Sequence, residues 1–283
     1  MQLSVPPLPN RSFNQSCEQL FDTHCHLDLP ELATELPAFL DSAIKAGVRR
    51  ILVPAVEAAR WAGLLQLQQQ TTSLRLELAL GIHPWWAQHA TETQLDTLAN
   101  MVRVEAGVCA VGEIGLDFAL VQEDEEATRK LHQWQQTLFS AQLALAAKAG
   151  KPVVLHHRKS QPALLAELKR QQFSQGGILH AFSGSTAQAH AFLDLGFKLG
   201  IGGTISYERA QKTRETVRKL PLSALVVETD APAMPLAGFQ GQVNTPAQLA
   251  LVFQQLCALR TESVDRLAQA LWQNSLAALH LPL

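Results

Sequence analysis

Short apolar runs rich in β-branched residues recur along the chain, and segments with a helical spacing of apolar positions separate them. Eight such runs predict strands, at residues 20–26, 50–56, 76–84, 108–115, 152–157, 177–182, 197–203 and 224–232. Strands that alternate with helices are typical of parallel α/β folds, and eight strands can close a (β/α)₈ barrel. We therefore predict a single (β/α)₈ barrel. An open doubly wound sheet is the alternative, because alternation alone does not show closure.

The segments between the runs have the apolar stripes of helices that pack on one side. One stripe consists of Leu36, Phe39, Leu40, Ala43 and Ile44. Gly47 is placed to end that helix. A second stripe consists of Leu131, Trp134, Leu138, Ala141 and Leu145. Near the C-terminus, Thr245, Pro246 and Gln248 predict a capping box. The helix after this box has a predicted core face of Leu249, Val252, Phe253 and Leu256.

The composition supports one folded domain. Of the 283 residues, 47% are hydrophobic and 17% are charged, which allows a sizeable core and differs from the composition of a disordered chain. We assign residues 21–283 to the barrel and residues 1–20 to a proline-containing, partly disordered extension. The formal net charge is -2, so attraction to a nucleic acid would have to come from local residues or from a metal.

The four cysteines, Cys17, Cys25, Cys109 and Cys257, are far apart and form no C-x-x-C motif, which argues against a disulfide framework or a structural zinc site. The first twenty residues lack the basic start and apolar core of a signal peptide. No segment is apolar enough to span a bilayer. We expect a cytoplasmic, monomeric protein that does not associate with membranes.

The first predicted strand carries the stretch FDTHCHLD, residues 21–28, which is rich in polar side chains. Residues two apart on a strand share a face, so Asp22, His24 and His26 point one way and Cys25 the other. At the C-terminal mouth of a barrel, the two imidazoles would converge on one point. Taken alone, an H-x-H pair is equally consistent with hydrogen-bonded core histidines.

Other predicted strands also end in side chains that bind metals. AVGEIGLD places Glu113 at the end of the fourth strand, and PVVLHH places His156 at the end of the fifth. GILHAFSG places His180 at the end of the sixth strand, and VVETDAP places Asp230 at the end of the eighth. Together with the two histidines of the first strand, six nitrogen and oxygen ligands would gather at one mouth.

The ligand types indicate the class of metal. Imidazole and carboxylate without thiolate suit zinc, manganese or another divalent first-row ion, and magnesium where oxygen ligands dominate. A catalytic zinc normally takes about three protein ligands, so six predict two divalent ions bridged by a carboxylate. Such pairs cleave phosphodiesters, because one ion activates water while both neutralise the attacking and departing oxygens.

The motifs DTHCHLD, GIHP, VGEIGLDF, PVVLHHR, HAFSGS and ETDAP, and the later N-x-P of Asn244 and Pro246, resemble those of the TatD-type metal-dependent hydrolases. These are deoxyribonucleases with the TIM-barrel fold of the metallo-dependent hydrolases. The resemblance runs from about residue 21 to the C-terminus, in the order of the family. The stretches GGTISYERAQKTRETVRKLPL and ETDAPAMPLAGFQGQ look closest to the little-characterised YjjV branch.

The resemblance implies two sets of metal ligands. The first set consists of His24, His26, Glu113 and Asp230. The second set consists of Glu113, His156 and His180. The family usually has a serine or another small polar residue after the strand 5 histidine, whereas this chain has His157. Alternation along the strand turns His157 away from His156, so we leave it outside the metal set.

The implied ligands have expected roles. Glu113 is the bridging carboxylate, and Asp230 binds an ion and accepts a proton from the attacking water. An isolated T-D-A-P would instead favour a helix N-cap. His83, in GIHP, contacts the scissile phosphate or protonates the leaving oxygen, with a purely structural role as the alternative. Asp22 and Glu228 lie one layer deeper and either orient the ligands or pair with unrelated barrel residues.

Basic and aromatic residues near the predicted mouth are candidates for substrate binding. Arg158 follows the fifth strand and can grip a phosphate bidentately. The basic run at residues 208–219, with Tyr207 and Arg209, can follow a single strand by charge and base stacking. A run of this kind is more often a solvated helix face.

These expectations combine in a metal-dependent deoxyribonuclease that trims single-stranded DNA from 3′ to 5′, with the preference for DNA implied by the resemblance alone. An alternative enzyme keeps the metals but hydrolyses an amide, a lactone or the ester of a misacylated tRNA, because related barrels catalyse many hydrolyses. A third hypothesis is a non-catalytic barrel that binds metal or nucleic acid. The complete set of six ligands argues against this third hypothesis.

Overall fold

The computed structural model describes residues 19–282, so most of the predicted extension, residues 1–20, lies outside the described residues. The strands are β1 (Leu20–Asp22), β2 (Val48–Pro54), β3 (Arg75–Leu80), β4 (Val108–Asp117), β5 (Val153–Arg158), β6 (Gly177–Leu179), β7 (Phe197–Ile201) and β8 (Leu225–Val227). They pair in parallel in the order β1 to β8. The (β/α)₈ barrel is confirmed. The doubly wound alternative is wrong, because such a sheet reverses its strand order part-way across.

The two ends of the sheet meet just beyond β1 and β8. The backbone N–H of Thr23 donates to the carbonyl of Val227 over 3.1 Å, and the N–H of Asp230 donates to the carbonyl of His24 over 2.9 Å. A parallel bridge pairs Cys25 with Ala231. This seam holds the segments after β1 and β8 side by side.

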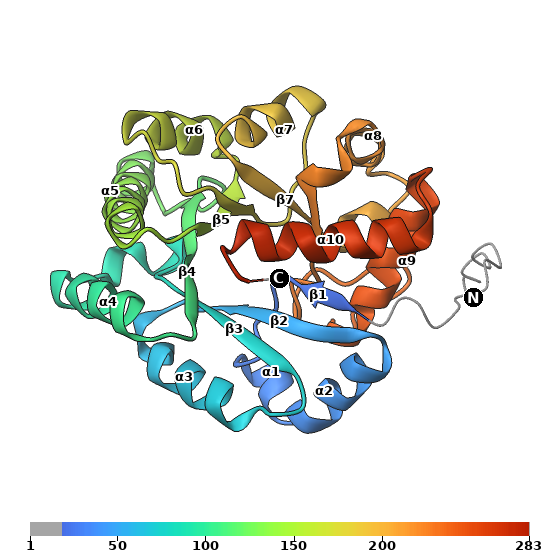
Figure 1. Ribbon diagram of the computed structural model, residues 1–283. Helices are drawn as coiled ribbons and strands as arrows, with labels where there is room; N and C mark the ends of the chain where they lie inside the picture. Colours follow the sequence, from blue (N-terminus) through green and yellow to red (C-terminus); the bar gives the residue numbers. More distant parts are fainter. Residues whose placement is uncertain (1–18, 283) are drawn as a thin grey trace.

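The helices surround the sheet (Figure 1). They are α1 (Pro30–Ala33), α2 (Leu36–Lys45), α3 (Trp61–Gln70), α4 (Glu92–Val104), α5 (Glu125–Ala149), α6 (Gln161–Arg170), α7 (Thr186–Leu193), α8 (Gln211–Lys219), α9 (Leu249–Leu259) and α10 (Val264–Ala278). Short 3₁₀ helices are η1 (Ala58–Arg60), η2 (Pro84–His89), η3 (Gly203–Ser206), η4 (Leu222–Ala224) and η5 (Pro246–Gln248). Within residues 19–282, none of the helices is both long and apolar enough to cross a membrane.

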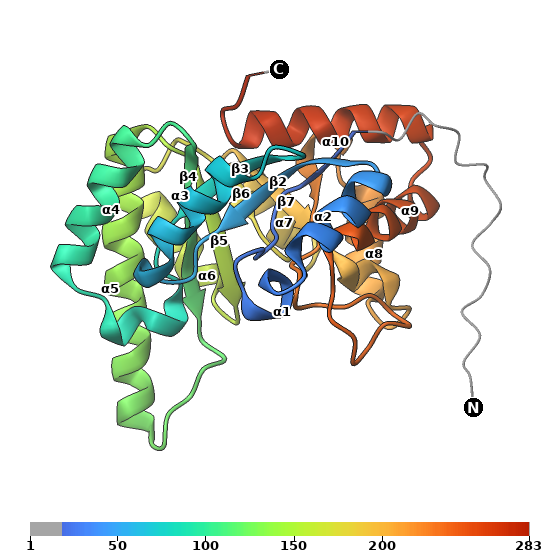
Figure 2. The ribbon, with the colours of Figure 1, turned by 90° about the horizontal axis from the view of Figure 1, so that it is seen from below.

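One end of the barrel is closed by apolar side chains. Helix α10 lies across this end and contacts β1, β7 and β8 (Figure 2). Leu276 of α10 and Leu279 directly after it join an interior cluster with the strand residues Phe21, Leu52, Ala79, Ala110, Val154, Ile178 and Val226. A second, larger cluster packs the outside of the strands against the helices. The polar residues that follow the strands therefore lie at the opposite, C-terminal end.

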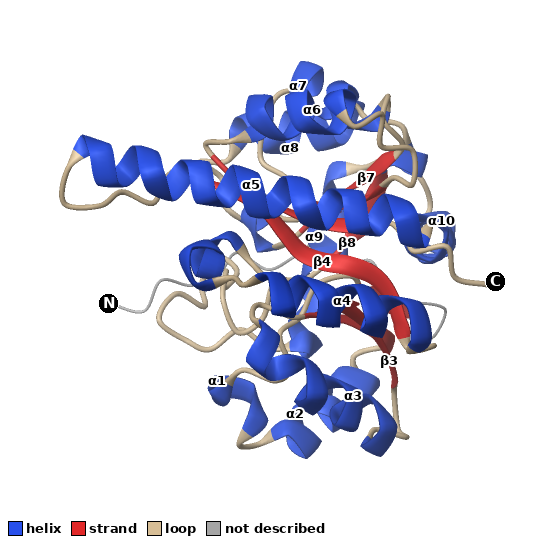
Figure 3. Ribbon diagram, turned by 90° about the vertical axis from the view of Figure 1, so that its left-hand side faces the viewer, coloured by secondary structure: helices blue, strands red, loops and turns tan. Residues whose placement is uncertain are grey.

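Helix α5 is long, and its N-terminal part extends beyond the barrel (Figure 3). The predicted apolar stripe is wrong at Trp134, whose side chain is 48% exposed. The apolar part of the buried face consists instead of Leu131, Leu138, Phe139, Leu143 and Ala146. Two glutamines, Gln135 and Gln142, share this buried face and bond to the barrel backbone, as described below.

The predicted capping box and the predicted strand lengths differ from the structure, whereas the core face of α9 agrees. Thr245 precedes the 3₁₀ helix η5 and makes no capping hydrogen bond with its side chain, so the predicted capping box is absent. The core face of α9 is as predicted, with Leu249, Val252, Phe253 and Leu256 buried. Several strands are shorter than their apolar runs, so the histidines after β1 and β6 lie in loops, where strand alternation no longer sets their direction.

Candidate metal centre

The structure brings all six predicted ligands to the C-terminal mouth. His24 and His26 follow β1, and His180 directly follows β6. Glu113 lies within β4, His156 lies within β5, and Asp230 follows β8. The side chains of His24, His26, Glu113 and His180 are buried, whereas those of His156 and Asp230 are 16% and 15% exposed. The last two therefore form the side of the cluster that solvent can reach.

His24, His26 and Glu113 face one point, and Asp230 lies beside the two histidines. The Nε2 atom of His24 lies 3.1 Å from Nε2 of His26 and 3.1 Å from Oε2 of Glu113. Asp230 Oδ1 lies 3.8 Å from His24 Nε2 and 3.6 Å from His26 Nε2. Among the described residues, no group close enough to share one ion combines Glu113 with Asp230, so the first ligand set as a whole stays a prediction.

Glu113 faces a second group of imidazoles with its other oxygen. Oε1 lies 2.9 Å from Nδ1 of His156 and 3.6 Å from Nε2 of His83. The two oxygens of one carboxylate thus point to two different groups of ligands, which is the arrangement that a bridging ligand requires. His83 is buried and lies inside this second group, so the structure places it at the centre rather than beneath the mouth.

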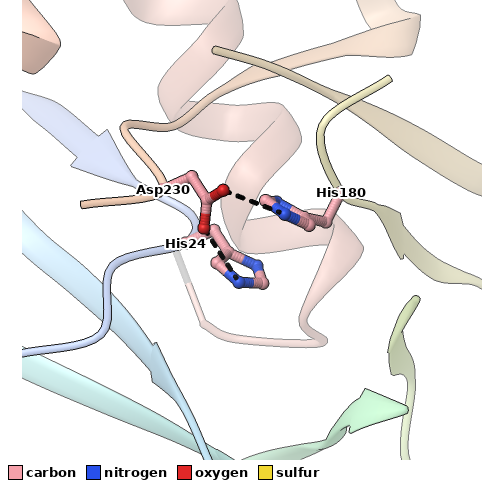
Figure 4. A group of neighbouring side chains, drawn as sticks. All are labelled: His24, His180 and Asp230. Carbon is pink, nitrogen blue, oxygen red and sulfur yellow. Dashed lines mark ion pairs between the residues drawn. The ribbon is translucent and has the colours of Figure 1, made fainter. Parts of the chain in front are cut away.

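His180 lies on the other side of His24. Its ring stacks on His24 with a centroid separation of 3.5 Å, and its Nε2 lies 3.6 Å from Oδ2 of Asp230 (Figure 4). Among the described residues, the groups close enough to share one ion are His24 with His180 and Asp230, His24 with His26 and Glu113, and His83 with Glu113 and His156. None of these groups combines His156 with His180, so their assignment to one ion stays a prediction.

The spacing around His24 and the protonation of His24 and Glu113 suit a divalent metal. A metal with bonds of about 2.1 Å separates neighbouring ligand atoms by about 3.0 to 3.4 Å, close to the spacing around His24 Nε2. Burial lowers the pKa of His24 well below its usual value, so the ring is neutral. Burial alone would raise the pKa of Glu113, but the nearby His24 and His83, and hydrogen bonds from His156 and His24, hold it well below the usual value. Neutral imidazole and ionised carboxylate are the forms that bind metals.

The charges around Asp230 and His180 also favour a bound cation. Burial raises the pKa of Asp230. Burial alone would lower the pKa of His180, but the negative charges of Glu228 and Asp230 raise it to about 10. In this low-dielectric mouth, the carboxylates therefore hold a proton on His180, and a bound metal ion would supply the positive charge in its place.

Glu228 lies behind His180. Its Oε1 atom is 2.9 Å from Nδ1 of His180 and accepts a hydrogen bond of 2.6 Å from the backbone N–H of Ala181. Gly200 makes room for this carboxylate, because a Cβ at that position would lie 2.1 Å from Oε2 of Glu228. Glu228 thus orients His180, as the sequence analysis considered.

Asp22 acts through the backbone rather than on an imidazole. Its carboxylate accepts hydrogen bonds from the backbone N–H and the hydroxyl of Thr229, and from the N–H of His24. Asp230 follows with a φ of +57°, a conformation that is uncommon for a residue with a side chain. The buried Asn244 donates to the carbonyls of Thr229 and Ala233, which holds the loop around Asp230 in place.

Sequence reasoning missed a functional position at Asp117. Its Oδ2 atom lies 3.6 Å from Nε2 of His156 and accepts a hydrogen bond of 2.9 Å from Nε1 of Trp85. Burial alone would raise its pKa, but the nearby His156 and the hydrogen bond from Trp85 lower it to about 2. Strand alternation could have found Asp117, because it lies four residues after Glu113 and therefore on the same face.

Sequence reasoning also missed two positioning residues on α5. Gln135 accepts from the N–H of Asp117 over 2.9 Å and donates to its carbonyl over 3.1 Å. Gln142 forms the same pair of bonds with Ile82, at 2.7 and 3.0 Å. Ile82 precedes His83, so each glutamine holds the backbone at one part of the mouth. Their signal in the sequence is a seven-residue spacing of amides within an apolar helix face.

The predicted substrate residues surround the centre without joining it. Arg158 is exposed, with Nη1 4.0 Å from Oδ2 of Asp117. The Tyr207 hydroxyl donates to the carbonyl of Pro235, and the Arg209 guanidinium lies 4.7 Å from the Tyr207 ring centroid. His157 belongs to none of the metal groups of residues 19–282, and its Nδ1 lies 3.2 Å from Nε2 of Gln161. Along α8, most charged side chains are exposed, as on a solvated helix face.

The chain is similar to known proteins over most of its length. The family described as "TatD related DNase" matches residues 21–280. The uncharacterised metal-dependent hydrolase YjjV of Escherichia coli K12 is 45% identical over 265 residues, which cover 93% of this chain and 99% of that protein. The crystal structure of YjjV superposes with a TM-score of 0.86 over 94% of this chain and 100% of that chain, at 44% identity.

A relative with a named activity is more distant. The 3′-5′ ssDNA/RNA exonuclease TatD of Erwinia amylovora is 32% identical over 259 residues, which cover 88% of this chain and 95% of that protein. The family match and the similarity to YjjV confirm the resemblance inferred from the motifs. The chain belongs to the TatD related DNase family of metal-dependent hydrolases.

Proposed function

We propose that this protein is a deoxyribonuclease that uses two divalent metal ions to trim single-stranded DNA from the 3′ end. The observation that carries the proposal is Glu113, a buried carboxylate whose two oxygens face two different groups of imidazoles. A bridged pair of ions suits phosphodiester cleavage, because both the attacking and the departing oxygen need stabilisation.

The residues that would hold the ions are His24, His26, Glu113, His156, His180 and Asp230. When bound, manganese, zinc or magnesium would supply Lewis acidity and make water acidic enough to react at neutral pH. Asp230 is partly exposed and accepts the proton of the attacking water. The positive charge of the bound ions would offset the effect of burial, which raises the pKa of the Asp230 carboxyl.

His83 would act on the departing oxygen. Its Nε2 lies 3.6 Å from Glu113, and its Nδ1 accepts a hydrogen bond of 3.2 Å from the backbone N–H of Trp85, so Nε2 carries the proton in the neutral ring. Burial lowers the pKa of His83 to about 3. A neutral ring of this kind stabilises a developing oxyanion by donating a hydrogen bond.

The preference for single-stranded DNA is supported by the printed activity of the Erwinia relative and by residues around the mouth. Arg158 is exposed beside the second group of ligands and can pair with a phosphate. Tyr207 and Arg209 line a hollow of about 330 Å³ together with Met234 and Pro235, after β7 and β8. An aromatic ring and a guanidinium at this position can contact the strand upstream of the cleaved bond.

The experiment begins with protein stripped by a chelator. Manganese, magnesium and zinc are restored separately, and release of label from a 3′-labelled DNA strand is followed for the wild type and for Asp230→Asn. We expect metal-dependent release by the wild type, reduced at least 100-fold in the variant. A folded protein that binds two metals but releases no label with any ion would contradict the nuclease activity, and amide, lactone and aminoacyl ester substrates would then be tested.

A further inference from the structure

An exposed tryptophan lies directly beside the metal-ligand cluster. Trp85 is the second residue of the 3₁₀ helix η2, two residues after His83, and its side chain is 51% exposed. The ring centroids of Trp85 and His83 are 4.9 Å apart, and the rings meet edge to face at 85°. By contrast, the indole of Trp61 is buried and donates to the carbonyl of Gly81. Burial in the core therefore does not account for Trp85.

Three contacts fix the orientation of the Trp85 indole. Its Nε1 donates to Oδ2 of Asp117 over 2.9 Å, its backbone N–H donates to His83, and its ring stacks on Trp86 at a centroid distance of 6.1 Å. The ring is thus held at its polar edge, while half of its surface remains open to solvent. A rigid ring loses little conformational entropy when it binds a flat ligand, so this arrangement favours stacking.

We propose that Trp85 is the stacking platform for the nucleobase next to the scissile phosphate, and that it makes the enzyme prefer an unpaired terminal nucleotide. This inference rests on the proposed nuclease function. Only the side chain of His83 lies between the Trp85 indole and Glu113. The phosphate at the metal centre and the base on Trp85 would therefore be parts of one nucleotide. A base inside a duplex is covered by its neighbours on both faces, so it must leave the stack before it can lie on the indole.

Base stacking on an aromatic side chain tolerates any base, because every base has a flat aromatic face. The platform would therefore select for strandedness and not for sequence. Removal of one such platform weakens binding of the strand by roughly 10-fold or more.

The test uses two 5′-labelled single strands that differ only in the 3′-terminal nucleotide, which carries either a base or a tetrahydrofuran abasic sugar. Removal of that nucleotide is measured for the wild type, Trp85→Leu, Trp85→Phe and the control Trp134→Leu. Trp134 is a matched control, because its indole is 48% exposed on α5. The wild type should show a KM roughly 10-fold lower for the strand with a base.

Trp85→Leu should lose this difference in KM between the two strands. Trp85→Phe should keep most of the difference, because phenylalanine also stacks on a base. Some of the difference should be lost, because phenylalanine cannot donate a hydrogen bond to Asp117. Trp134→Leu should keep the full wild-type difference. Thermal melting of each variant checks that it is folded. The platform is overturned if Trp85→Leu keeps the wild-type difference, or if it lowers kcat equally on both strands, which would mean that Trp85 only supports His83 and Asp117.

A binding measurement separates this inference from the proposed function. Fluorescence anisotropy of the same two strands is measured with Asp230→Asn, alone and combined with Trp85→Leu, so that no cleavage is needed. Tighter binding of the base-bearing strand that depends on Trp85 supports the platform, even if the wild type cleaves neither strand and the nuclease function fails. Equal binding of both strands by Asp230→Asn would reject the platform.

Discussion

Buried carboxylates support two of the imidazoles of the mouth from behind. Glu228 faces Nδ1 of His180, and Asp117 faces Nε2 of His156. A carboxylate in this position fixes the orientation of the ring and increases its basicity as a metal ligand. The metal affinity of the centre should therefore depend on residues that contact no metal.

The substitution Glu228→Gln tests this dependence. The amide nearly preserves the volume of the side chain but removes the charge next to His180, so we expect metal affinity to fall by roughly 10- to 100-fold. Isothermal titration of the stripped protein with manganese or zinc measures the change. Glu215→Gln, on the exposed face of α8, is the control and should bind metal as the wild type does. Unchanged affinity in Glu228→Gln would mean that Glu228 holds only the backbone of Ala181.

The contribution of Arg260 and Glu262 to the stability of the fold should depend on pH. Hydrogen bonds from Arg260 lower the pKa of Glu262 from 4.5 to about 2. Because the pKa is lower in the folded state, the pair stabilises the fold fully above about pH 5 and loses this effect as pH falls towards 2. The gap in the free energy of unfolding between the wild type and Glu262→Gln should therefore shrink on acidification.

Urea unfolding at several pH values between 6 and 3 measures this gap. Glu215→Gln is again the control, because its ion pair with Lys219 is exposed and such pairs contribute little at any pH. A gap that stays constant down to pH 3 would contradict the assigned pair. A gap that widens on acidification would mean that the pKa of Glu262 is raised by folding, and would also contradict the assigned pair.

At the scale of elements, α5 does more than cover the barrel. Its buried glutamines bond to both backbone groups of Ile82 and of Asp117, just where β3 has ended and β4 ends. Each side-chain amide forms hydrogen bonds with a backbone N–H and a backbone carbonyl that have no partner within the sheet. The helix therefore sets the position of backbone next to His83 and at Asp117.

We expect Gln142→Leu to lower the free energy of unfolding by about 2 to 4 kcal/mol, because it leaves the N–H and the carbonyl of Ile82 buried without partners. Urea unfolding measures the loss. Gln136→Leu, at an exposed position of the same helix, should change stability by less than about 0.5 kcal/mol. Equal effects of the two substitutions would show that the bonds to Ile82 contribute nothing beyond general packing.

At the scale of the whole molecule, the candidate ligands come from β4 and β5 and from the segments directly after β1, β6 and β8. An ion bound among them would connect segments that are distant in sequence and lie on different sides of the barrel mouth. It would also neutralise carboxylates that are buried in the folded state only. Binding of metal should therefore stabilise the whole fold.

Removal of metal tests this coupling. At a metal concentration 100 times the dissociation constant, binding contributes about 2.7 kcal/mol, which corresponds to a rise in Tm of roughly 4 to 5 °C for a chain of this size. Calorimetry with chelator and with restored manganese measures the shift. Glu113→Gln should lose most of the shift, since Glu113 faces both groups of imidazoles. An identical Tm with and without metal would contradict the coupling.

The sequence by itself determined the architecture and the candidate ligand residues. The strand-like runs and the helical stripes between them predicted the barrel, because burial on both faces of a parallel strand requires continuous apolar residues. The ligands were recognisable because they interrupt these runs at their ends, as His156 and Asp230 do. The positions of these residues in the chain were enough to predict that they meet at the mouth.

Only the tertiary structure decided how the ligands group. His180 lies beside His24 and Asp230, and His83 lies beside Glu113 and His156, because the segments after short strands follow loop contacts such as the seam between β1 and β8. The roles of Asp117 and Gln142 also depended on contacts between distant elements. Periodicity along a chain reports which face a side chain shares with its neighbours, whereas partners across the barrel are set by how the elements pack.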